Sequence, residues 1–335
     1  MILSAEKKTL KFIKPAKTSR GEYLEKTAVV LRLCVGKTVL FESEASPLVD
    51  LSIDGREDLM SILSPYLSTN YSLDSLFELK ESLYQTPTLR FAVDCLIRQV
   101  KQGNRVWVEN AFSKKENGIP INGLVWMNDI QEMENQALAK IEAGFDVIKI
   151  KVGALDFDEE CRLLERIRKK HNAFKTTLRL DANGAFDIDA ALEQIKELSR
   201  FEIHSIEQPI KPGQEELEMI CRETNIPVAL DEELIGFELG SANSFIQKTK
   251  PSYLVLKPTL LGGLDRADSW VSVAEKNNIG WWSTSALEGN IGLYDIALWA
   301  SSHRNTLPQG LGTGSLFVEN FPAKTRVIKN TLFAV

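Results

Sequence analysis

Two short stretches decide the fold that the sequence predicts. Residues 147–151 read VIKIK and residues 177–181 read TLRLD. Each is a strand-like run that ends in a charged residue, Lys151 or Asp181, whereas strands buried in a parallel sheet are otherwise almost wholly apolar. The charged ends therefore need a functional or structural reason.

The same pattern recurs along the chain at a regular interval. Glu207, Asp231 and Lys257 each close an apolar run, and the spacings from Lys151 onward are 30, 26, 24 and 26 residues (181−151, 207−181, 231−207, 257−231). One strand with its crossover helix occupies about this length. The spacing predicts βα units in series.

Eight candidate strands with amphipathic segments between them predict an α/β fold, a (β/α) barrel of the TIM type. The strands are predicted at residues 122–126, 147–151, 177–181, 205–207, 228–231, 253–257, 280–283 and 309–311. Helices are predicted between them at residues 131–143, 158–170, 189–199 and 264–276.

The residues before the barrel predict a smaller α+β domain. Strand-like runs at 27–35 and 38–43 flank a Gly-Lys turn, and helical segments follow. A chain of 335 residues is also longer than one core usually organises. We therefore expect a capping domain over residues 1–115, a catalytic barrel over 116–315 and a segment, 316–335, that packs back on the capping domain.

Composition excludes several classes of protein. A net charge of −6, without a dense basic stripe, disfavours nucleic-acid binding. The sequence contains no apolar run near the roughly 20 residues of a membrane span, and we expect a cytoplasmic protein that binds no membrane. The four cysteines are scattered singly, which favours neither a zinc site nor a disulfide framework. Oligomeric state is not predicted.

The charged strand ends predict a metal site. In a barrel the carboxyl ends of the strands converge on one mouth, so Asp181, Glu207 and Asp231 should lie close together. Three carboxylates repel one another unless a cation compensates them, and oxygen ligands suit Mg²⁺, with Mn²⁺ as a substitute. No cysteine or histidine sits at these strand ends, which disfavours zinc.

Lysines complete the predicted site. Lys149 and Lys151 are two residues apart on one strand and share a face, where mutual repulsion favours loss of a proton from one of them. Lys257 belongs to a strand across the mouth. Arg179 shares the face of Asp181, where contact with a substrate carboxylate and an ion pair with neighbouring acids are equally good interpretations. A single charged residue at a strand end is usually exposed to solvent or part of a structural ion pair. Five such residues at one spacing would require the same coincidence five times, so a shared site explains them better.

At this point the motifs resemble those of a known family, the muconate lactonizing branch of the enolase superfamily. The resemblance spans the whole chain. It implies a capping domain whose loops close over the mouth, with Arg20 in a lid loop. It also implies Mg²⁺ on the three acids, Lys151 and Lys257 as the acid/base pair, and Asn183 and Glu232 as supporting residues. The motifs are, in order, Lys149-Ile150-Lys151, Asp181-Ala182-Asn183, Glu207-Gln208-Pro209, Asp231-Glu232 and Leu256-Lys257-Pro258.

Within that branch, residues 87–92 (PTLRFA), 285–293 (SALEGNIGL) and 310–314 (GLGTG) resemble the o-succinylbenzoate synthases of menaquinone biosynthesis. The resemblance implies dehydration of a small carboxylate, a cyclohexadiene that bears a succinyl group. Ser285 and backbone amides near Gly312 would hold the succinyl carboxylate, and Lys149 would be a further substrate contact. Ala286 stands where the family often has a second serine, so Ser285 would make that contact alone.

Other functions stay open from the sequence. An N-succinylamino acid racemase would use the same lysines on opposite faces of its substrate, and muconate cycloisomerisation shares the fold. A dipeptide epimerase is disfavoured, because those enzymes resemble one another in an Asp-x-Asp where this chain has Gly312-Thr313-Gly314. A non-catalytic metal-binding regulatory protein is the remote alternative, and the intact lysines argue against it.

Overall fold

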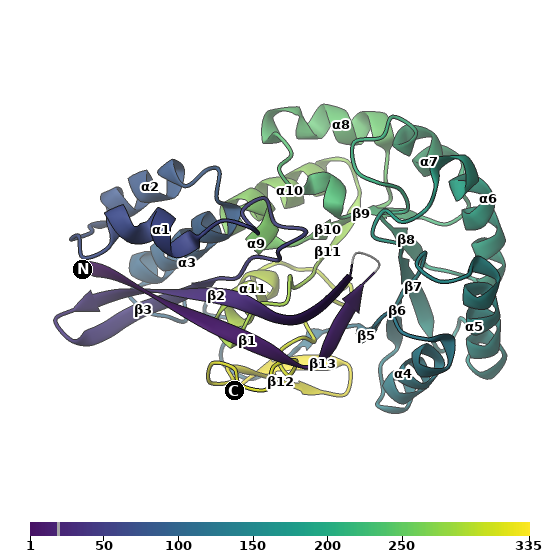
Figure 1. Ribbon diagram of the computed structural model, residues 1–335, viewed down its shortest axis with the longest axis horizontal. Helices are drawn as coiled ribbons and strands as arrows, with labels where there is room; N and C mark the ends of the chain where they lie inside the picture. The colour runs from purple at the N-terminus through teal and green to yellow at the C-terminus, as the bar shows by residue number, and fades with distance from the viewer. Residues whose placement is uncertain (19–20) are drawn as a thin grey trace.

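The computed structural model describes residues 1–18 and 21–335. An antiparallel sheet with helices forms an N-terminal unit, and a curled parallel sheet with helices outside it forms the larger part of the molecule (Figure 1). This arrangement confirms the predicted barrel with an N-terminal α+β domain. Among the described residues, no helix is long and apolar enough to span a membrane.

The N-terminal unit pairs three antiparallel strands in the order β1-β2-β3. The β2–β3 turn falls at Gly36, which adopts φ +58°, a conformation that glycine tolerates without strain. Leu31 and Leu33 of the middle strand face the helices in one buried cluster. The elements are β1 (Ile2–Thr18), β2 (Gly21–Val35), β3 (Thr38–Ala45), α1 (Leu59–Leu63), η1 (Ser64–Tyr66), α2 (Leu73–Ser82) and α3 (Pro87–Gln102).

The barrel follows with seven parallel strands that lie in chain order from β5 to β11. Helices of the βα units surround them in Figure 1. The elements are β5 (Gly123–Val125), α4 (Ile130–Glu142), β6 (Val147–Lys151), α5 (Phe157–Lys170), β7 (Thr177–Asp181), α6 (Ile188–Leu198), η2 (Ser199–Phe201), β8 (Ser205–Glu207), α7 (Leu217–Glu223), β9 (Val228–Leu230), η3 (Glu232–Leu234), η4 (Leu239–Ser241), α8 (Ala242–Thr249), β10 (Tyr253–Leu256), α9 (Pro258–Leu261), α10 (Leu264–Lys276), β11 (Gly280–Ser283) and α11 (Asn290–Ser302).

The eighth strand is shorter than the predicted 309–311. Two isolated parallel bridges, Ile121↔Gln309 and Thr284↔Gly310, link this segment to the segment ahead of β5 and to the end of β11. Gly310 is needed there, because a Cβ atom would lie 2.6 Å from the Thr284 hydroxyl oxygen. The segment still closes the barrel, since Gly310 N–H donates to the Ser283 carbonyl at 2.7 Å and Asn122 N–H to the Gln309 carbonyl at 3.0 Å.

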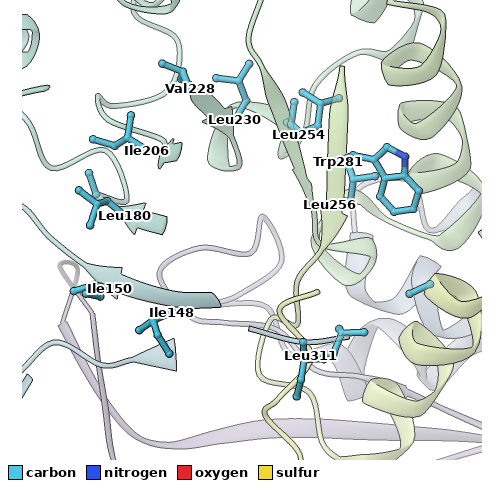
Figure 2. Packing of buried hydrophobic residues seen from close by; sticks show 14 of the residues in the cluster. Ile148, Ile150, Leu180, Ile206, Val228, Leu230, Leu254, Leu256, Trp281 and Leu311 are labelled. Atoms are coloured by element: carbon cyan, nitrogen blue, oxygen red, sulfur yellow. The ribbon is translucent and has the colours of Figure 1, made fainter. Parts of the chain in front are cut away.

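The alternating direction of side chains along the barrel strands points the charged residues into the barrel. Ile148 and Ile150 of β6 and Leu180 of β7 belong to the large buried cluster that also contains helix residues such as Leu164 and Ile195 (Figure 2). Because successive side chains of a strand point to opposite faces, the residues between these ones face the barrel interior. Sequence alternation alone therefore places the lysines and acids of these strands inside.

The C-terminal residues contact both parts of the molecule. Ile13 N–H of β1 donates to the Leu316 carbonyl at 2.8 Å, and Val318 N–H donates to the Lys11 carbonyl at 2.9 Å. Beyond them, β12 (Thr325–Ile328) and β13 (Thr331–Ala334) form a small antiparallel sheet with β4 (Ile119–Pro120), which precedes the first barrel strand.

Candidate active site

The register of neighbouring strands sets three charged residues side by side. Lys151 on β6 pairs with Asp181 on β7, and Asp181 pairs with Glu207 on β8. Asp231 follows β9, and Lys257 follows β10. All five are buried at the carboxyl ends of their strands, where a parallel barrel carries its active site.

The lysines and acids are ion-paired with one another. Lys149 Nζ lies 2.6 Å from Glu207 Oε1 and 2.7 Å from Asp181 Oδ2. Lys151 Nζ also contacts Asp181 Oδ2, at 2.6 Å. Lys257 Nζ forms a close pair with Asp231 Oδ2. The sequence-predicted metal ligands and the predicted lysines thus form one cluster at the strand ends of the barrel.

Burial and charge act against each other in this cluster. Burial raises the pKa of Glu207 well above its usual range, and the neighbouring charge of Asp181 adds to the rise. Burial opposes ionisation of Asp181 too, but Lys149 and Lys151 hold the pKa of this carboxyl well below its usual range. For Lys149, burial favours the neutral amine, yet Asp181 and Glu207 raise its pKa. Lys149 therefore stays a cation while it is paired with these acids.

The donor set fits a hard divalent cation. Asp181, Glu207 and Asp231 supply only oxygen atoms, and the acid-acid repulsion that raises the pKa of Glu207 is what such a cation would relieve. Among residues 1–18 and 21–335, no three acidic, histidine or cysteine side chains are arranged as a metal site. Lysine ammonium groups contact carboxylate oxygens of all three acids. The lysines would release these oxygens to a bound ion.

A cavity opens above the cluster and is lined by both parts of the molecule. Lys149, Lys151 and Lys257 line it, and so do Asn183 and Glu232. Asn183 Oδ1 accepts a hydrogen bond of 2.6 Å from Lys151 Nζ, while its Nδ2 donates to Glu232 Oε1 at 3.0 Å. Asn183 thereby links the Lys151 amine to Glu232, and its supporting role in the reaction stays a prediction.

Apolar and loop residues complete the cavity wall. They come from the N-terminal unit, from the first barrel strand and from the last two strand-end loops, and include Tyr23, Leu48, Leu51, Trp126, Leu287, Gly312, Thr313 and Leu316. A mostly apolar wall with a few polar groups is typical of a pocket for a small molecule.

The two residues predicted to bind the succinyl group differ in whether their hydrogen-bond donors already have partners. Ser285 Oγ donates to Glu288 Oε2 at 2.7 Å and accepts from Leu287 N–H at 2.9 Å and from Thr313 Oγ1 at 2.8 Å. These bonds use the one donor and both acceptor positions of the hydroxyl. Gly312 N–H, in contrast, makes no hydrogen bond to any residue that the structure describes, and Gly312 lines the cavity. The Gly312 amide is thus free for an anion, whereas Ser285 would first have to break a bond.

Arg179 lies one layer deeper in the barrel than the predicted metal ligands. It pairs in register with Lys149 and Ser205, its Nη1 donates to the Pro308 carbonyl at 2.8 Å, and its guanidinium lies 3.9 Å from the centre of the Trp282 ring. Burial lowers the pKa of Arg179 to about 10. These contacts favour a structural role. Arg20 lies outside the described residues.

Sequence reasoning missed Glu288 and Lys26, which lie next to the candidate substrate contacts. Glu288 belongs to the quoted segment 285–293 and could have been noticed as a charged residue within an apolar loop. Lys26 carries no such signal, because it reaches the barrel carbonyl of Ala286 from 260 residues away in the chain.

The structure predicts that Glu207→Gln weakens metal binding. If Glu207 binds the metal directly, its loss should raise the metal Kd by more than the roughly 10–100-fold that loss of an outer-shell partner costs. Titration calorimetry with Mn²⁺ measures this directly. Glu134→Gln is the control, because Glu134 pairs with Arg166 and Lys170 away from the barrel mouth. Unchanged Mn²⁺ affinity in Glu207→Gln would remove Glu207 from the ligand set.

The chain is similar to known proteins in sequence and in fold. The family model described as Enolase C-terminal domain-like matches residues 132–328. An o-succinylbenzoate synthase of Desulfotalea psychrophila is 35% identical over 98% of this chain and 97% of its own length. The crystal structure of MenC from the same organism matches with a TM-score of 0.83 at 33% identity, covering 100% of this chain and 99% of that one.

A more distant solved structure shares the fold. A dipeptide epimerase from Enterococcus faecalis, described as complexed with Mg and a dipeptide, matches with a TM-score of 0.83 at 18% identity over 100% of this chain and 96% of that one. The family match and the full-length relative confirm the resemblance drawn from the motifs. The chain belongs to the enolase superfamily, in the family described as Enolase C-terminal domain-like.

Proposed function

We propose that this protein catalyses the dehydration of 2-succinyl-6-hydroxy-2,4-cyclohexadiene-1-carboxylate to o-succinylbenzoate, with a divalent metal ion held by Asp181, Glu207 and Asp231. The observation that carries the proposal is that Lys151 and Lys257, from strands far apart in the barrel, line one cavity above these three acids. The full-length relative of Desulfotalea psychrophila, named o-succinylbenzoate synthase, supports the choice of substrate.

The chemistry divides among the residues of the cavity. Mg²⁺, when bound, supplies positive charge next to the substrate carboxylate, where negative charge develops as the α-proton leaves. Lys151 takes that proton as its free amine, and Asn183 orients the nitrogen. The same Lys151, now protonated, gives the proton to the departing hydroxide, so one water leaves and the ring becomes aromatic. Lys257 stays a cation over the opposite face and stabilises the planar intermediate.

The other residues of the cavity would bind the substrate and transfer no proton. Apolar side chains from the N-terminal unit, Leu48 and Leu51, would cover the ring and exclude water. The exposed N–H of Gly312 would bind the succinyl carboxylate, since unpaired amides in a glycine-rich turn suit anions. Lys149 pairs with Asp181 and Glu207 and would remain beside them as a cation once their oxygens hold the ion.

Racemisation of N-succinylamino acids is the second candidate, because Lys257 lines the same cavity as Lys151 and could act as a base on the opposite face. Steady-state assays of the purified protein with Mg²⁺ separate the two. We expect kcat/KM for the succinyl cyclohexadiene substrate to exceed that for any N-succinylamino acid by at least about 100-fold, within the range that substrate-matched polar sites achieve. Racemisation without formation of o-succinylbenzoate would overturn the proposal in favour of the racemase.

A further inference from the structure

The loop after β11 carries an unusual concentration of buried polar contacts. Residues 284–289 lead from β11 into α11, and Leu287 adopts φ +61° there, which is uncommon for a residue other than glycine. Glu288, at the centre of the loop, is completely buried. A buried carboxylate is costly unless donors surround it, so its partners define its purpose.

Glu288 joins three strand-end loops. Its carboxylate accepts from Ser285 Oγ at 2.7 Å, from Ala286 N–H at 3.0 and 3.1 Å, and from Thr259 Oγ1 at 2.6 Å. Thr313 Oγ1 donates to the same Ser285 hydroxyl at 2.8 Å.

These partners stand next to the residues that face the cavity. Thr259 lies two residues after Lys257, and Thr313 directly follows Gly312. One carboxylate therefore ties together the loops that carry Lys257, Ser285 and Gly312, on the side of the cavity assigned to the succinyl group.

The N-terminal unit holds the same loop from the other side. Lys26 of β2 is buried, and its Nζ donates to the carbonyls of Ser46 and Ala286, both at 3.0 Å. Glu44 of β3 accepts from Gly289 N–H at 2.6 Å and from Gly292 N–H at 2.9 Å. The loop is thus bound by the N-terminal unit on both sides of Glu288.

A purely structural contact between the two parts exists elsewhere and serves as the comparison. Lys80 of α2 is equally buried, and its Nζ donates to Asp265 Oδ2 at 2.7 Å and to Asp94 Oδ1 at 3.3 Å. Asp265 lies in the first turn of α10, two residues after Gly263, and among the described residues Lys80 Nζ contacts neither the Ser285 loop nor the Gly312 loop. Lys26 and Lys80 therefore differ in what they hold, although both tie the N-terminal unit to the barrel.

We propose that Glu288 is a positioning residue that sets the subsite for the succinyl carboxylate, and that Lys26 makes this position depend on the docked N-terminal unit. The inference rests on the proposed function and names which residues define its substrate specificity. Neither side chain touches the reacting atoms. Their effect passes through Ser285, Gly312 and the backbone that follows Lys257.

The test compares Glu288→Gln, Lys26→Met and the control Lys80→Met in the full-length protein. In Glu288→Gln, the new side-chain amide would present an N–H₂ group where Ser285 and Ala286 need acceptors, so the three loops should separate. We expect kcat/KM for the succinyl cyclohexadiene substrate to fall about 100-fold in Glu288→Gln, because displacement by about 1 Å has that effect on well-placed groups. Lys26→Met should raise KM about tenfold with kcat within about threefold, and Lys80→Met should change neither by more than about twofold.

Hydrogen–deuterium exchange gives a readout that does not depend on the substrate. Peptides covering residues 257–263, 284–290 and 310–316 should exchange faster in Glu288→Gln and in Lys26→Met. In Lys80→Met, the peptides 284–290 and 310–316 should exchange at the wild-type rate. The same test can be made at Thr259. Thr259→Val removes the hydroxyl that donates to Glu288 and should raise KM, whereas Thr259→Ser keeps the hydroxyl and should leave KM at the wild-type value. Wild-type exchange of all three peptides in Glu288→Gln, or equal KM effects in Lys26→Met and Lys80→Met, would overturn the proposal. If the wild-type protein makes no o-succinylbenzoate, the proposed function fails and the exchange data still decide whether Glu288 joins the loops.

Discussion

Lys151→Arg should abolish dehydration, with a loss of at least about 10³-fold in kcat, within the range that one acid/base group contributes. Arginine keeps the positive charge next to Asp181 but stays protonated at ordinary pH, so it cannot take the substrate proton. Racemisation of any N-succinylamino acid should be lost as well, since Lys151 serves one face of that reaction. Stopped-time assays with o-succinylbenzoate detected by absorbance measure the first loss.

Lys140→Arg is the matched control for this substitution. Lys140 of α4 also lines the cavity, and its Nζ lies over the Phe145 ring, apart from the carboxylate cluster. We expect kcat within about twofold of wild type, because a cavity-lining charge that holds no acid changes the rate little. Near-wild-type dehydration by Lys151→Arg would show that another group takes the proton.

Lys257→Arg should separate the two reactions. If dehydration proceeds on one face, Lys257 contributes only positive charge, which guanidinium retains. Dehydration should therefore survive at a measurable rate, although the larger planar group reduces it by up to about 100-fold through misplacement. Racemisation needs a base on each face and should disappear.

Exchange of the substrate α-proton with deuterated solvent measures catalysis on each face of the substrate separately in Lys257→Arg. The α-proton of an N-succinylamino acid should still exchange in the enantiomer whose proton faces Lys151, and exchange should vanish in its mirror image. Proton NMR of each pure enantiomer with Mg²⁺ gives both rates. Similar exchange of both enantiomers would mean that Lys257 is not the second-face base and that the opposed placement of the two lysines is wrong.

The strand ends and their chemistry were predictable because two simple regularities coincide there. Alternation on β6 puts Lys149 and Lys151 on one face, and parallel strands bring their carboxyl ends to one mouth. The predicted 147–151, 177–181, 205–207 and 280–283 match β6, β7, β8 and β11 as observed. The strands β9 and β10 end one residue earlier than predicted, since Asp231 and Lys257 already leave the ladder.

Other features depend on contacts that leave no local pattern. Alternation along β7 indicates that the Arg179 side chain faces the barrel interior. Its position below the metal ligands is set by contacts with the Pro308 carbonyl and the Trp282 ring, which lie far away in the sequence. The sequence predicts that the Ser285 hydroxyl can bind the substrate. In the structure this hydroxyl already forms hydrogen bonds with Glu288 and Thr313, which converge on it. The bridge that closes the barrel at the eighth strand depends on Gly310, whose missing side chain lets Thr284 approach.

The most direct test of the account is product formation from 2-succinyl-6-hydroxy-2,4-cyclohexadiene-1-carboxylate under control of metal. The purified protein, stripped with a chelator and exchanged into metal-free buffer, should form no o-succinylbenzoate by proton NMR. The lysines already pair with the three acids, so the ion would supply the further positive charge that a substrate carboxylate needs next to them. Added Mg²⁺ or Mn²⁺ should restore one o-succinylbenzoate per substrate consumed. Full turnover in metal-free buffer, or consumption of substrate without o-succinylbenzoate after Mg²⁺ is restored, would contradict it.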